Sequence, residues 1–125
     1  MIHLDTSLLV DALTGPRRSA GALRKTIERG ERVTLSTLVL YEWRRGPRQP
    51  EELAAQEALF PNESVVPFGR QEAVLAAELY RAIRRPRGRE IDLAIAACAL
   101  ANEAEFWTLN PQGFRDIPGL TIFTG

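Results

Sequence analysis

The chain has 125 residues, of which 45% are hydrophobic and 26% charged; this excludes a disordered chain and predicts one compact domain spanning residues 1–125. Its 16 basic and 16 acidic residues give a formal net charge of zero, which excludes a uniformly basic nucleic-acid-binding surface but not a locally basic face. A single cysteine, Cys98, excludes an intrachain disulfide and a cysteine metal cluster, and with no signal peptide or apolar run of about 18 residues we expect a soluble, cytoplasmic protein without a membrane span.

Short apolar runs alternate with longer helical patterns in the first half of the chain. Residues 2–4 form the first predicted strand, and the oxygen-bearing residues 5–7 directly after it are suited to cap a helix. Ser36 or Thr37 is the predicted cap of a later helix. The other elements predicted here are helices over 8–13, 19–29, 38–43 and 50–59 and a strand over 32–35.

The second half continues this alternation. Its predicted elements are a strand over 64–68, helices over 71–85 and 90–102, and strands over 106–108 and 120–123. Pro67 restricts the first of these strands to a sheet edge or a strand end, because proline lacks an N–H. The helix over 90–102 is apolar on almost every side, which predicts burial, and Asp92 is its one interior charge. Alternating strands and helices predict an α/β fold with a parallel sheet.

Three acidic residues occupy comparable places in this pattern. Asp5 follows the first strand, Glu42 lies in a mainly apolar helix, and Asp92 lies in the first turn of the most buried helix. Ligands of open parallel sheets bind at the carboxyl ends of the strands. Two carboxylates about 4 Å apart repel by roughly 4 kcal/mol at an effective dielectric constant of 20, so a converging cluster needs a cation or raised pKa values. All-oxygen ligands favour Mg²⁺ or Mn²⁺.

Each of these acids also has a structural interpretation. Asp5 alone is suited to cap a helix, Glu42 alone to extend its carboxylate from a helix surface into water, and Asp92 alone to complement a helix dipole. Only their combination within an alternating α/β pattern favours a metal site.

Arginines are concentrated on either side of the acidic positions. One cluster, near Asp92, contains Arg81, Arg84, Arg85, Arg87 and Arg89, and a second, just after Glu42, contains Arg44, Arg45 and Arg48. Either cluster is a solvated helix face, a phosphate-binding rim for RNA, or a contact surface for a protein partner. The sequence leaves these three uses open.

Several other residues with potential chemistry are assigned to the core. Trp43, Trp107 and Cys98 lie among apolar neighbours, and no histidine or asparagine pattern marks Cys98 as a nucleophile. His3 lies within the first strand and is expected to be a packed or hydrogen-bonded core histidine.

Four segments of the chain resemble, in order, segments of PIN-domain proteins, and among these the short VapC-type toxins of type II toxin–antitoxin pairs. They are IHLDTSLLV (2–10), LSTLVLYE (35–42), DLAIAACAL (92–100) and TLNPQGF (108–114), the last followed by IPGL (117–120). The resemblance spans the whole chain. It implies a three-layer α/β/α sandwich around a short central parallel sheet, and a Mg²⁺- or Mn²⁺-dependent endoribonuclease that pairs with an antitoxin.

The resemblance also implies roles for individual residues. Asp5, Glu42 and Asp92 match the family's metal-binding acidic positions, while Thr6, Ser7 and Thr108 match supporting hydroxyl positions beside them. A metal ion held there activates water for hydrolysis of an RNA phosphodiester bond. Family members often form homodimers, for which Leu38, Leu40 and Tyr41 are candidate contacts unless they pack internally.

The last segment departs from the family pattern. Relatives commonly carry an aspartate or asparagine two residues after the threonine and another acid just before the phenylalanine, where this chain has Asn110 and Gly113. Asn110 offers an amide oxygen to a metal ion or its water but no charge, which favours one tightly held metal over two. The alternative function is a catalytically degenerate PIN domain that binds RNA or protein. A nucleotide-binding or phosphotransfer domain is a weaker alternative, because no glycine-rich phosphate-binding motif is present.

Overall fold

The computed structural model describes all residues, 1–125, as an α/β arrangement of six helices around a short sheet. The strands are β1 (Ile2–Leu4), β2 (Val33–Thr34) and β3 (Glu105–Trp107). The helices are α1 (Thr6–Leu13), α2 (Ala20–Glu28), α3 (Thr37–Arg45), α4 (Pro50–Leu59), α5 (Arg70–Ala82) and α6 (Glu90–Ala101). Two 3₁₀ turns, η1 (Asn62–Ser64) and η2 (Pro111–Phe114), complete the elements. No helix is both long and apolar enough to span a membrane.

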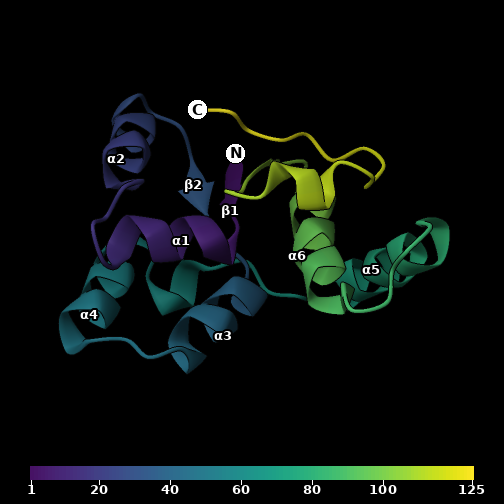
Figure 1. The fold of residues 1–125 in the computed structure, drawn as a ribbon, viewed down its shortest axis with the longest axis horizontal. Helices are drawn as coiled ribbons and strands as arrows, with labels where there is room; N and C mark the ends of the chain where they lie inside the picture. Colours follow the sequence, from purple (N-terminus) through teal and green to yellow (C-terminus); the bar gives the residue numbers. More distant parts are fainter.

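The sheet is parallel with the strand order β2-β1-β3. Ile2 pairs with Val33 on one side and Glu105 on the other, and Leu4 pairs with Trp107. Figure 1 shows β1 and β2 at the centre, α1 and α2 to the left, and α6 and α5 to the right. The expected three-layer α/β/α arrangement is therefore confirmed, and the first residues of the chain occupy its centre.

The predicted helices form, and their starts follow the expected caps. Asp5 is the N-cap of α1, which begins at Thr6 rather than at residue 8. Ser36 is the N-cap of α3, where its hydroxyl accepts a hydrogen bond from Val39 N at 3.3 Å. Helix α5 ends at Ala82, three residues before the predicted end at 85, and the backbone is already extended at Ile83, where ψ is 156°. Pro86 restricts only Arg85, the residue directly before it.

The predicted strands over 64–68 and 120–123 are wrong as strands. Each is reduced to one parallel bridge, Ser36 with Val66 and Phe106 with Ile122. In the first segment, the η1 turn occupies the beginning and Pro67 provides no N–H to extend the ladder. The second segment makes two backbone hydrogen bonds to Phe106 and then leaves the sheet.

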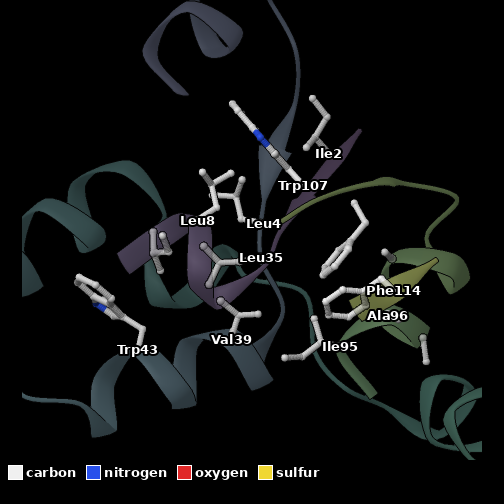
Figure 2. Packing of buried hydrophobic residues seen from close by; sticks show 14 of the residues in the cluster. Ile2, Leu4, Leu8, Leu35, Val39, Trp43, Ile95, Ala96, Trp107 and Phe114 are labelled. Atoms are coloured by element: carbon white, nitrogen blue, oxygen red, sulfur yellow. The ribbon is translucent and has the colours of Figure 1, made fainter. Parts of the chain in front are cut away.

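The core surrounds β1. Figure 2 shows Leu4 from β1 and Val39 and Trp43 from α3 among its buried side chains. On α6, all residues over 93–99 are buried, as predicted. Trp43 and Cys98 have no exposed surface, and desolvation raises the pKa of the Cys98 thiol to about 11, so this cysteine is a packing residue.

His3 is buried without a hydrogen-bond partner on either ring nitrogen. Burial is the main cause that lowers its pKa to about 4, and the positive chain terminus adds to it. The expectation that His3 packs in the core is confirmed, while no hydrogen bond accompanies the packing. A neutral imidazole at the centre of the sheet is the consequence.

Candidate functional site

Asp5 lies at the carboxyl end of β1 and is 7% exposed. Its backbone N–H donates to the Trp107 carbonyl at 2.9 Å, which continues the pairing of β1 with β3 by one residue. Its Oδ1 accepts the Thr6 N–H at 2.9 Å. Asp5 therefore caps α1, and this structural role leaves Oδ2 for other contacts.

The second carboxylate oxygen of Asp5 is held by two hydroxyls. Oδ2 accepts hydrogen bonds from Thr108 Oγ1 at 2.7 Å and from Ser7 Oγ at 3.1 Å. Each hydroxyl is oriented in turn, because Thr108 Oγ1 accepts the Asn110 N–H at 3.0 Å and Ser7 Oγ accepts the Leu109 N–H at 3.1 Å. Ser7 and Thr108, two of the hydroxyls expected beside the acidic residues, thus contact the Asp5 carboxylate, and backbone amides fix the direction in which they donate.

Glu42, in the second turn of α3, is held by α1. Its Oε1 accepts a hydrogen bond from Thr6 Oγ1 at 2.6 Å, and Oε2 lies 3.6 Å from an Arg45 guanidinium nitrogen. Thr6 therefore contacts both carboxylates, Asp5 through its N–H and Glu42 through its hydroxyl. Spacing along the sequence could assign Thr6 to its neighbour Asp5 but could not reveal its contact with Glu42, 36 residues away.

Asp92 lies in the first turn of α6, near enough to Asp5 and Glu42 for their charges to act on it. It is exposed and takes no part in the two salt bridges of the molecule. Its pKa is raised by partial burial and by the negative charges of Asp5 and Glu42, against an opposing effect of Arg89. The pKa of Asp5 is also raised, chiefly by burial and in part by Glu42, although its three hydrogen bonds act in the other direction.

These shifts place the three carboxylates within electrostatic range of one another. They do not converge on one point, since no three Asp, Glu, His or Cys side chains are gathered at a spacing that directly encloses a metal ion. The donors are carboxylate and hydroxyl oxygens, and this set matches hard divalent cations such as Mg²⁺. Mg²⁺ usually keeps several waters and binds directly to one or two carboxylates. The chemistry of the site thus fits such an ion, with water completing the ligand set.

Asn110 is brought to the site by its backbone, and its side chain lies against Gly113. A Cβ atom placed on Gly113 would lie 2.5 Å from Asn110 Nδ2 and 3.2 Å from Cγ. The glycine at position 113 is therefore coupled to Asn110, because the amide of Asn110 fills the space where a side chain at position 113 would begin.

The arginines predicted near Asp92 fall into two groups. Arg89 is fully engaged, with hydrogen bonds to Asp116 Oδ2 at 2.8 Å, to Asp116 Oδ1 at 2.7 Å and to the carbonyls of Gly113 and Arg85. The other four, Arg81, Arg84, Arg85 and Arg87, have exposed side chains without an ion-pair partner. The pairing of Arg89 with Asp116 was not predicted, since the two residues are 27 positions apart and no local spacing relates them.

Of the residues expected at a homodimer face, Tyr41 is 60% exposed. Leu38 and Leu40 pack partly against the core.

Comparisons with known proteins agree on the family. The family model for the PIN domain matches residues 2–120. The ribonuclease VapC19 of Mycobacterium tuberculosis is 34% identical to this chain over 119 residues, which cover 94% of both proteins.

Solved structures share the fold. The structure of VapBC2 from Rickettsia felis bound to a promoter DNA fragment contains a chain with a TM-score of 0.77 and 22% identity, with 98% of each chain covered. A chain of FitAcB from Neisseria gonorrhoeae has a TM-score of 0.73 and 21% identity, with 99% of this chain and 97% of that chain covered. A toxin–antitoxin complex from Klebsiella pneumoniae gives a TM-score of 0.71 and 22% identity, covering 97% and 96%.

Proposed function

Since this chain belongs to the PIN domain family, we propose that it is an endoribonuclease, the toxin of a toxin–antitoxin pair, that uses Mg²⁺ or Mn²⁺ to hydrolyse RNA phosphodiester bonds. The observation that carries the proposal is the hydrogen-bonded pair of carboxylates at the carboxyl end of β1, where Thr108 and Ser7 hold Asp5 and Thr6 joins Asp5 to Glu42. Asp92, in the first turn of α6, is near enough that the charges of both raise its pKa. The 34% identity to a ribonuclease over nearly the whole chain supports the same activity.

Asp5 and Asp92 are the proposed direct ligands of a single cation. Their charges are disfavoured in the structure by burial and by neighbouring carboxylates, Glu42 for Asp5 and both Asp5 and Glu42 for Asp92, and a bound divalent cation offsets these costs. Glu42, on α3 and hydrogen-bonded to Thr6, orients the cation or its water. When bound, the metal lowers the pKa of water and polarises the phosphate.

The protein's own groups prepare the reaction. Thr108 and Ser7 fix the Asp5 carboxylate by donating to Oδ2, so that the side chain needs no reorientation during the reaction. Asn110, whose N–H donates to Thr108 Oγ1, is the proposed donor of an amide oxygen to the water of that ion. Water attacks phosphorus and the bond to O3′ breaks, which yields a 5′-phosphate and a 3′-hydroxyl without a protein nucleophile.

The partners follow from the same proposal. RNA phosphates contact the exposed arginines Arg84, Arg85 and Arg87, because guanidinium groups bind phosphate oxygens in pairs. A cognate antitoxin covers the site, as the toxin–antitoxin complexes among the structural relatives suggest. A homodimer that uses exposed Tyr41 and a cytoplasmic location complete the proposal.

Cleavage of a panel of structured RNAs by the partner-free protein tests the proposal. We expect cutting with Mg²⁺ or Mn²⁺, none with EDTA, and none by Asp5→Asn or Asp92→Asn. Glu103→Gln, an exposed carboxylate outside the site, is the matched control and retains activity. Full activity of either aspartate variant would overturn the assigned site. A folded protein that binds metal and RNA but cuts no RNA would support the alternative, a catalytically inactive binding module.

A further inference from the structure

A polar groove opens beside the carboxylates, along α1. It has a volume of about 370 Å³ and is lined chiefly by Thr6, Ser7, Asp11, Thr14, Arg18 and Leu109; we name it the α1 groove. We propose that the α1 groove binds one nucleotide of a single-stranded RNA segment next to the bond that is cut, with Arg18 on its phosphate and Leu109 against its base. This inference rests on the proposed ribonuclease function.

The groove is continuous with the proposed catalytic site. Thr6 and Ser7 line it, and the same two hydroxyls donate to Glu42 and to Asp5 respectively. A strand whose phosphate lies at the carboxylates therefore enters the α1 groove with its neighbouring nucleotide. The volume is at the lower end of the range for ligand pockets, which suits one nucleotide and not a base pair.

The charges in the groove suit a phosphate at one end. Arg18 is exposed and belongs to neither salt bridge, and it is the one cationic side chain that lines the groove. The single lining carboxylate, Asp11, accepts a hydrogen bond from Ser19 Oγ at 2.6 Å. An unpaired guanidinium is thus the group available to a phosphate, and it offsets the negative charge of the neighbouring catalytic site.

The loop that carries Arg18 is held in a defined conformation. Thr14 donates to the Val10 carbonyl through its N–H at 3.0 Å and through its hydroxyl at 2.7 Å. Arg17 donates to the Thr14 carbonyl and has a φ of 54°, a value that few non-glycine residues adopt. A backbone held in this way lowers the entropy that is lost when Arg18 binds a phosphate.

Leu109 supplies the apolar surface. Its side chain is 49% exposed, and its backbone N–H is anchored to Ser7 Oγ at 3.1 Å. An aliphatic side chain packs against the face of any base but forms no hydrogen bond with base edges. The α1 groove therefore contributes affinity that does not depend on which base occupies it.

Binding of a fluorescent, random-sequence 10-nucleotide single-stranded RNA pool tests the inference. The measurements use Asp92→Asn protein, which does not cut, over a range of salt concentrations. We expect Arg18→Ala to weaken binding by about 3- to 10-fold and to reduce the salt slope by about 0.7, the value for one phosphate contact on a single strand. Leu109→Ala is expected to weaken binding by about 2- to 3-fold without changing the slope.

Arg32→Ala is the matched control. Arg32 is an exposed arginine whose carbonyl accepts the Ile2 N–H. It therefore lies at the amino end of the strands, whereas Asp5 lies at their carboxyl end. We expect it to bind RNA like the parent, and circular dichroism verifies that every variant is folded.

Three outcomes would overturn the inference: Arg18→Ala binds like the parent, Arg18→Ala and Arg32→Ala weaken binding equally, or the parent binds none of the pool. The proposed function is judged separately, by metal-dependent cleavage with the unsubstituted protein. If that protein cuts structured RNA while Arg18→Ala binds the pool normally, the ribonuclease proposal stands and the proposal for the α1 groove is wrong.

Discussion

Arg89 and Asp116 form a two-pronged ion pair in which each guanidinium NH₂ group donates to a different carboxylate oxygen, at 2.8 and 2.7 Å. Arg89 is the residue directly before α6, and it also donates to the Gly113 carbonyl. The pair therefore fastens the turn that carries Asn110 and Gly113 to the end of α6 that carries Asp92. Two segments of the proposed site are thus held in a fixed relation by contacts outside it.

Asp116→Asn tests this attachment. The side chains of Arg89 and Asp116 are 23% and 50% exposed, so solvent screens the pair and we expect a loss of about 1 kcal/mol in the free energy of unfolding. Urea unfolding at pH 7 measures the loss, and Arg115→Gln, an exposed neighbour without a salt bridge, controls for removal of a charge. A loss above about 3 kcal/mol would contradict the assignment of a solvent-screened pair.

Asp92→Asn is expected to stabilise the metal-free protein at pH 7. Burial and the charges of Asp5 and Glu42 raise the pKa of Asp92, so its ionisation disfavours the folded state once the pH rises above the unfolded value. The gain should be present at pH 7 and absent near pH 3, where the carboxyl is protonated in both states. Glu90→Gln removes a charge from the same helical turn and controls for the helix dipole; equal effects of the two variants would contradict the repulsion.

Added Mg²⁺ or Mn²⁺ is expected to raise the melting temperature most at neutral pH. Saturation at 100 times the dissociation constant corresponds to about 2.7 kcal/mol of stabilisation. The raised pKa values of Asp5 and Asp92 mean that protons compete with the metal at higher pH than for ordinary carboxylates, so the effect should decline as the pH falls toward 4. Thermal melts with Asp5→Asn as the control measure it; a shift that persists in this variant would place the metal elsewhere.

His3→Leu is expected to remove a loss of stability in mild acid. The pKa of His3 is lowered from 6.5 to about 4, so the folded state favours the neutral imidazole. His3 therefore leaves the free energy of unfolding unchanged above pH 6.5 and lowers it as the pH falls toward 4, by roughly 3 kcal/mol. The difference in unfolding free energy between parent and variant, measured at pH 7 and pH 4, isolates this effect from the opposite contribution of Asp5 and Asp92. A difference that is constant with pH would exclude His3 as the source.

Gly113→Asp is expected to increase Mn²⁺ affinity several-fold. The substitution displaces the Asn110 amide, which lies where the new Cβ must go, and adds a carboxylate beside the site. Gly113→Asn displaces Asn110 equally but adds no charge, so its affinity should not rise. Isothermal titration of both variants separates the two effects, and matching affinities would show that the missing acid at position 113 has no bearing on the metal.

Much of the fold could be predicted because local signals agree with it. Asp5 and Ser36 are typical N-cap residues and predict the starts of their helices, and the unbroken apolar run over 93–99 predicts a buried helix. The predicted strands over 64–68 and 120–123 failed because the strength of a strand depends on its neighbours in space. Val66 and Ile122 each form a single bridge, and the residues of these two segments alone do not show that strand pairing stops there.

Candidate residues for the site could be named from the sequence, but their contacts could not. Asp5, Glu42 and Asp92 stand at positions that chemistry and family pattern single out. Glu42 raises the pKa of Asp5, and the charges of Asp5 and Glu42 raise the pKa of Asp92, which agrees with that choice. The bond from Thr6 to Glu42 and the contact of Asn110 with Gly113 depend on side-chain packing between distant segments. No periodicity encodes such contacts.

The position of β1 at the centre of the sheet also sets when the site comes into being. The Asp5 carboxylate depends on Thr108, 103 residues later in the chain, and β1 has its β3 neighbour only once Glu105–Trp107 have been synthesised. During translation β1 can therefore pair only with β2 until Glu105–Trp107 have been synthesised. A nascent chain that stops before Thr108 lacks the assembled acidic site, so any activity of this protein begins only after that residue has been synthesised.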